Sequence, residues 1–130
     1  VVLSAGWRLT AEWVAGNALP TDLTQTPPWE AYLAVSPTAV LRLRGRLPGE
    51  RFVPLGMAGH TVKLKEMMIN RKIPAALRRR WPLVVDDMGV LWLSGLAQAD
   101  RTAVRPDTPT VLKLTLHAPT KPPDSGENLS

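Results

Sequence analysis

Lysine and arginine residues are concentrated between Arg42 and Trp81. This stretch contains eleven of them against two acids, Glu50 and Glu66, for a local formal charge of +9, whereas the rest of the chain has five bases and nine acids, a net of −4. Cations packed this densely repel one another, by roughly 1 kcal/mol for an exposed pair about 4 Å apart in water, unless anions lie between them. The sequence therefore predicts one basic face that binds a polyanion.

Phosphate oxygens suit guanidinium forks and ammonium groups, so the predicted partner is a nucleic acid backbone. Any one of these cations, taken singly, is as well explained by a solvated surface. A membrane fits less well, because the predicted helices have a modest apolar moment and no Trp or Phe anchors on their outward face. Phosphate contacts position a nucleic acid without identifying its sequence. The residues predicted to make them are Arg42, Arg44, Arg51, Lys63, Lys65, Lys72, Arg78 and Arg79.

Other chemistry has little support in the sequence. His60 and His117 lie far apart, there is no cysteine, and no carboxylate stands at ligand spacing, so no metal site is predicted. The pair Asp86-Asp87 precedes a glycine between two apolar runs and is interpreted as a hairpin turn rather than an acid/base pair. The glycine-rich segment 56–59 lacks the Lys-Ser/Thr of a phosphate loop. We therefore predict no catalytic residue and no cofactor in this chain.

The elements that position the basic face follow from periodicity and turn residues. Apolar and polar residues alternate at period two in several segments, which predicts strands, and apolar spacing of three to four residues predicts two short helices joined as a hairpin. The fold class is α+β, with mostly antiparallel, sandwich-like sheets. The predicted strands are 7–14, 31–35, 39–47, 83–85, 90–93 and 111–117, and the predicted helices are 62–70 and 75–80.

The length of 130 residues allows one domain, predicted at 1–117, with a Pro-rich loop at 18–30. Residues 118–130 turn to Pro, Ser, Gly and acids without apolar periodicity, which predicts a disordered tail. The chain begins at Val1 and is expected to be a fragment of a longer protein. Apolar runs are too short to cross a bilayer, there is no signal-peptide pattern, and cysteine is absent, so a cytoplasmic protein is expected.

The basic stretch also has the motifs of a known family. Gly49-Glu50-Arg51-Phe52 is followed by Pro54-Leu55-Gly56-Met57-x-Gly59, Lys63-Leu64-Lys65, Lys72-Ile73-Pro74, an Arg cluster, Trp81-Pro82-Leu83-Val84-Val85, and Leu91-Trp92-Leu93-x-Gly95. In this order and spacing the motifs resemble the C-terminal domain of bacterial tRNA(Ile)-lysidine synthetase. The resemblance is best over residues 41–101.

This resemblance implies a fold shared with a domain of the phenylalanyl-tRNA synthetase β subunit. It implies a parent enzyme that uses ATP to attach lysine to the wobble cytidine of tRNA(Ile) with anticodon CAU, making lysidine. The family's ATP site belongs to an N-terminal domain with an SGGxDS loop, which this sequence lacks. The fragment would then grip the acceptor stem beside that catalytic domain and be inert alone.

The matched motifs assign Arg51, Lys63, Lys65 and Lys72 to tRNA binding, with Arg78 and Arg79 in the matched Arg region. Two residues depart from the family pattern at expected contacts with the tRNA backbone, because Ala75 and Ala97 stand where the family commonly has Arg. Those contacts are expected to be missing or displaced into the Arg78–Arg80 cluster and Arg101. The alternative hypothesis is a basic module that docks on an acidic protein or domain without nucleic acid.

Overall fold

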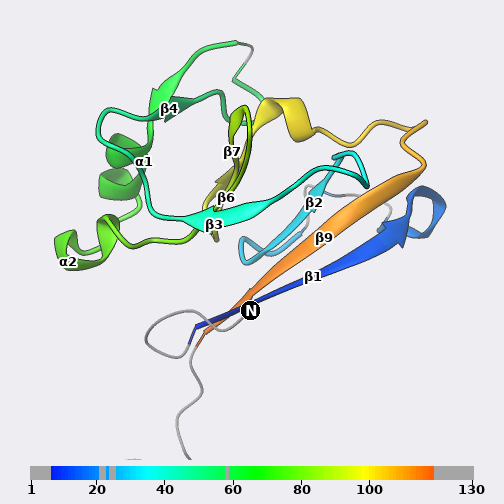
Figure 1. Cartoon of the computed structure of the whole chain (residues 1–130), viewed down its shortest axis with the longest axis horizontal. Coiled ribbons are helices and arrows are strands. Elements are labelled where there is room, and N and C mark those ends of the chain that lie inside the picture. Colours follow the sequence, from blue (N-terminus) through cyan, green and yellow to red (C-terminus); the bar gives the residue numbers. More distant parts are fainter. Residues whose placement is uncertain (1–6, 21–22, 24–25, 58, 119–130) are drawn as a thin grey trace, which may run out of the picture.

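Two antiparallel sheets packed face to face form the body of the domain (Figure 1). The computed structural model describes residues 7–20, 23, 26–57 and 59–118. The first sheet has the order β1-β9-β2, and the second has the order β3-β6-β7-β8. Their strands are β1 (Arg8–Ala15), β2 (Glu30–Leu33), β3 (Arg42–Arg44), β6 (Leu83–Asp86), β7 (Gly89–Leu93), β8 (Ala97–Gln98) and β9 (Thr110–His117).

A smaller unit covers the outer face of the second sheet. It consists of a two-stranded sheet, β4 (Arg51–Phe52) and β5 (Val62–Lys63), and of the helices α1 (Leu64–Asn70) and α2 (Ala75–Arg78). Two 3-10 turns, Gly16–Ala18 and Asp100–Thr102, complete the described elements. The predicted α+β class with sandwich-like antiparallel sheets and an inserted helical hairpin is therefore confirmed.

The second sheet is buried on both faces, and this explains its composition. One face packs Val84, Leu91 and Trp92 against the first sheet, while the other packs Leu83 and Leu93 against the smaller unit. A strand with two buried faces needs a continuous apolar run rather than alternation. The apolar runs 83–85 and 90–93 meet that need, and the hairpin predicted there is confirmed.

The hairpin turn between β6 and β7 is held by Asp86. Its carboxylate accepts a hydrogen bond from the Met88 amide at 2.9 Å and two from the Arg101 guanidinium at 2.7 and 2.9 Å. The Arg101 hydrogen bonds hold the pKa of Asp86 below its ordinary value, against an opposing effect of burial. The interpretation of Asp86-Asp87 as turn residues is thus confirmed.

Three sequence predictions differ from the structure. The strand predicted at 39–47 is only the three residues of β3, and the two-residue strands β4, β5 and β8 were not predicted. In β1 only Leu9 is buried, and Trp13 is 48% exposed. β1 is an edge strand that extends past the second sheet, so its alternation does not mark a fully buried face (Figure 1).

Gly45 explains why β3 ends early. A Cβ at this position would lie 2.1 Å from the Arg79 carbonyl oxygen, so the chain passes directly against the end of α2 instead of continuing the ladder. The Pro-rich loop at 18–30 and the tail at 118–130 lie partly or mostly outside the described residues, and their predicted states are not tested. No described helix is long and apolar enough to span a membrane.

Candidate nucleic-acid interface

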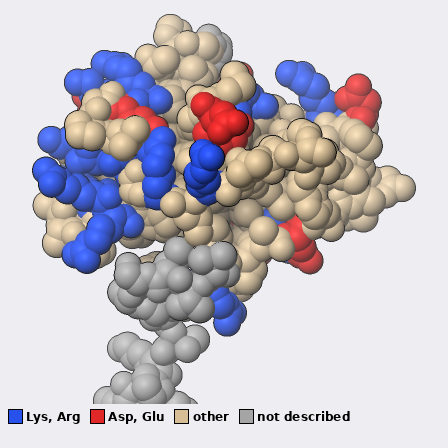
Figure 2. Space-filling view, viewed as in Figure 1, with Lys and Arg blue, Asp and Glu red and all other residues tan. Residues whose placement is uncertain are grey.

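The cationic surface is the set of exposed Lys and Arg side chains on the smaller unit and the segments beside it. Figure 2 shows Lys and Arg gathered over the end of the molecule where β4, α1 and α2 lie, with far fewer at the opposite end of this view. Seven of these cations are exposed and have no acidic partner among the described residues: Arg51, Lys63, Lys65, Arg71, Lys72, Arg79 and Arg80.

β4 and β5 place two of the cations side by side. Arg51 and Lys63 are directly opposite each other in the antiparallel register. Directly opposed residues have their Cβ atoms about 4.5–5.5 Å apart, and like charges in such a pair destabilise the sheet. The guanidinium of Arg51 has one weak internal contact, to the Thr61 hydroxyl at 3.5 Å. An anion bridging the two side chains would relieve this repulsion.

α1 positions the next group. Its buried residues, Leu64 and Met68, fix the helix against the second sheet, and Lys65 points to solvent from the first turn. Lys72, two residues after the end of α1, has φ = 61°, a left-handed conformation that favours glycine. Ile73 follows and packs back on the core, donating its amide to the Met68 carbonyl at 2.9 Å.

The arginine cluster at the end of α2 differs in exposure from one residue to the next. Arg79 and Arg80 are exposed, whereas Arg78 is half-buried and donates its Nε–H to the Ile73 carbonyl at 2.9 Å. This bond ties α2 to the end of α1 and leaves the terminal nitrogens of Arg78 for other partners.

Two predicted contact residues lie in internal ion pairs. Arg44 makes a bidentate pair with Glu50, at 2.8 and 2.7 Å, and also donates to the Gly45 carbonyl. The pair lowers the pKa of Glu50 and raises that of Arg44. Arg42 lies 3.5 Å from Asp87, but both side chains are more than 60% exposed, so this pair is weak. The binding roles predicted for both arginines stay predictions.

Glu50 organises the turn that precedes β4. Besides Arg44 it accepts the Leu47 amide at 2.9 Å, and its backbone carbonyl accepts the Leu64 amide at the start of α1. The matched motif around Glu50 and Arg51 is therefore partly structural. The acid anchors the strand from which Arg51 projects.

The remaining candidates have other partners or positions. His117 Nε2 lies 3.0 Å from the Thr10 hydroxyl, and His60 is exposed in a loop. The described residues contain no group of three or more His, Asp or Glu side chains placed to hold a metal ion. Arg101 donates hydrogen bonds to the Asp86 carboxylate and to the Gly89 carbonyl. This geometry does not favour the contact with the tRNA backbone that was expected for Arg101.

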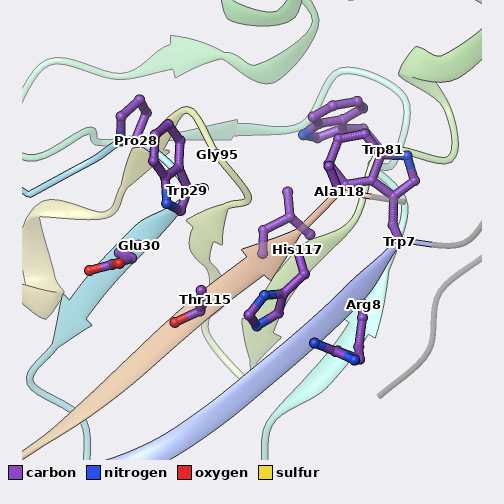
Figure 3. A pocket seen from close by; sticks show the side chains of 11 residues that line it. Trp7, Arg8, Pro28, Trp29, Glu30, Trp81, Gly95, Thr115, His117 and Ala118 are labelled. Carbon is purple, nitrogen blue, oxygen red and sulfur yellow. The ribbon is translucent and has the colours of Figure 1, made fainter. Parts of the chain in front are cut away.

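The list of predicted contact residues omits two exposed cations of this surface, Arg71 and Arg80, although Arg80 belongs to the cluster expected to take displaced contacts. Sequence reasoning also missed an open pocket of about 850 Å³, which lies mostly outside the basic stretch and is lined by Trp7, Trp29 and Trp81 (Figure 3). The three indoles are far apart in sequence, so only their unusual number among the aromatics gave a signal.

Comparisons with known proteins agree with this architecture. Residues 41–114 match the family model described as the TilS substrate C-terminal domain. The tRNA(Ile)-lysidine synthase of Geobacter sulfurreducens is 34% identical over 103 residues, covering 78% of this chain and 21% of that protein. The tRNA(Ile)-lysidine synthase of Symbiobacterium thermophilum is 32% identical over 122 residues, covering 93% of this chain and 24% of that protein. The chain thus spans between a fifth and a quarter of these relatives' length.

Two solved structures share the fold. A crystal structure of a TilS C-terminal domain superposes with a TM-score of 0.75 at 32% identity, covering 92% of this chain and 89% of that one. An N-terminal fragment of the Pyrococcus horikoshii phenylalanyl-tRNA synthetase β subunit superposes with a TM-score of 0.52 at 20% identity, covering 67% of this chain and 27% of that one, a similarity of fold alone. The chain belongs to the family of TilS substrate C-terminal domains, because the family model matches more than half of its residues and a solved TilS C-terminal domain has the same fold.

Proposed function

We propose that this chain binds tRNA through its cationic surface, as the substrate-binding domain of a tRNA(Ile)-lysidine synthetase. The observation that supports this most directly is the set of seven exposed cations with no acidic partner among the described residues, gathered at one end of the domain (Figure 2). The opposed pair Arg51 and Lys63 adds a local electrostatic cost that a bound polyanion would offset.

The partner within tRNA is proposed to be the acceptor stem. A duplex presents phosphates along a continuous rail, which suits cations projecting from one strand pair and two helix ends. Ligation of lysine to the wobble cytidine, with its ATP requirement, belongs in this proposal to the catalytic domain of the parent enzyme. In this proposal the chain binds and orients the tRNA, and the protein is located in the cytoplasm.

The test is the salt dependence of tRNA binding by the 130-residue chain. If about six of the cations contact phosphates, the slope of log K against log salt is about −5, and affinity falls about 10³-fold between 50 and 200 mM salt. Fluorescence anisotropy with a tRNA(Ile) transcript and with a hairpin of its acceptor stem alone gives both slopes. Similar slopes for the two RNAs locate the contacts on the stem.

A matched control separates this surface from general basicity. Arg105 is exposed but lies on the segment between Asp100–Thr102 and β9, at the other end of the molecule (Figure 1). Arg105→Ala should leave the slope unchanged, whereas Arg51→Ala should reduce its magnitude by about 0.9. Binding to an acidic protein without measurable binding to RNA would instead support the alternative of a basic module that docks on an acidic protein.

A further inference from the structure

A tryptophan-lined pocket lies outside the cationic surface. Its volume of about 850 Å³ is in the range of small-molecule sites. Figure 3 shows Trp29 on one side, Trp7 and Trp81 on the other, and the side chains of Thr115 and His117 from β9 between them. Three of the chain's five tryptophans thus face one space.

The far wall of this tryptophan pocket is preorganised. The Trp81 indole donates its Nε1–H to the Ser94 carbonyl at 2.8 Å, and the Trp7 ring meets it edge-on with centroids 5.9 Å apart. Trp29 on the opposite side is 52% exposed. Trp29 directly precedes β2, and half of its indole is exposed to water. Stacking on a planar ligand would bury this ring against another π system, an arrangement that aromatic rings favour.

The floor and rim of the pocket are polar. Thr115 offers a hydroxyl from the floor, and His117 offers the ring nitrogen that is not bonded to Thr10. Arg8 places an exposed cation at the rim, and the carboxylate of Glu30 also lines the pocket (Figure 3). Indole walls, hydrogen-bonding groups and a nearby positive charge together suit a nucleotide, with its planar base and its phosphate.

The tryptophan pocket continues from the cationic surface along the chain. Trp81 comes directly after Arg79 and Arg80, so one short segment contributes to both sites. An RNA stem whose phosphates lie on the arginines can therefore place an unpaired nucleotide from its end among the indoles. We propose that this pocket stacks an unpaired nucleobase at the 3′ end of the bound stem, an inference that rests on the proposed tRNA binding.

The experiment compares two RNA hairpins of the same stem, one blunt and one with a four-nucleotide single-stranded 3′ extension. Stacking of a base on an aromatic side chain changes affinity by about 1–3 kcal/mol, which corresponds to roughly 5- to 150-fold. The wild-type chain should bind the extended hairpin at least about fivefold more tightly. Trp29→Ala should abolish this gain, and Trp29→Phe, which retains a ring, should keep most of it.

Trp13→Ala is the matched control, because Trp13 is similarly exposed, at 48%, on β1 but does not line the pocket. The gain should persist in this variant. The pocket proposal is overturned if the extension adds nothing for the wild type, if the gain survives in Trp29→Ala, or if Trp13→Ala loses it equally. Tight, salt-sensitive binding of the blunt hairpin with no extension effect would refute the pocket alone, whereas failure to bind either hairpin would refute the proposed function as well.

Discussion

Substitution of Lys72 tests whether this residue lowers the stability of the domain while contributing to tRNA binding. It closes α1 in a left-handed conformation, with its amide bonded to the Ile69 carbonyl and the next amide, from Ile73, bonded to the Met68 carbonyl, both at 2.9 Å. This is the Schellman geometry, in which the left-handed residue is usually glycine. A side chain there costs about 1–2 kcal/mol. Glycine at this position would avoid that cost.

We predict that Lys72→Gly stabilises the domain while weakening its binding to tRNA. With central values of about 1.5 kcal/mol of backbone strain relieved and about 0.7 kcal/mol lost to the freer unfolded chain, the free energy of unfolding should rise by about 0.8 kcal/mol. Lys72→Ala deletes the same ammonium but keeps the strained φ. It should therefore leave stability nearly unchanged and serves as the matched control.

Both variants should lose the same binding contact. Removing one phosphate contact reduces the magnitude of the salt slope by about 0.9, which is about an eightfold loss of affinity at 0.1 M salt if the other contacts are unchanged. Urea unfolding measures the stability term, and anisotropy titration with tRNA at several salt concentrations measures the binding term. Equal stability of the Gly and Ala variants would refute the strain argument. Wild-type affinity in both would remove Lys72 from the interface.

Three further predictions concern the support of the same surface. Lys63→Ala combined with Lys65→Ala should flatten the salt slope of tRNA binding by about 1.8, and an unchanged slope in the same titration would exclude both lysines from the interface. Gly45→Ala would press a Cβ onto a backbone carbonyl oxygen at 2.1 Å, so urea unfolding should show a loss of about 1–3 kcal/mol; an unaltered midpoint would contradict the close approach. The pKa of Glu50 is lowered by its bond to Arg44, so its contribution to stability is complete above the ordinary value of 4.5 and is lost as the pH falls below it. The unfolding free energy of Glu50→Gln should therefore fall less steeply than that of the wild type as the pH is lowered below 4.5. Parallel pH profiles of the two proteins would argue against the pair.

Local sequence determined much of this fold because several signals are local in their physics. The apolar runs of β6 and β7, with a glycine-containing turn between them, specify a hairpin through burial and backbone freedom alone. The i, i+3, i+4 spacing of Leu64, Met67 and Met68 specifies one face of α1 in the same way. The two-residue strands β4, β5 and β8 could not be predicted, because two residues are too few to show an alternation of apolar and polar side chains.

The concentration of positive charge was evident from composition, but its division into structural and free cations was decided by tertiary structure. Arg44 and Arg51 are equivalent in the sequence, yet one is bound to Glu50 across a turn while the other projects beside Lys63. The tryptophan pocket likewise exists only because β1, β2, β9 and the segment after α2 converge. Charge and periodicity are properties of neighbouring residues along the chain, whereas ion pairs and pockets depend on which distant segments the fold brings into contact.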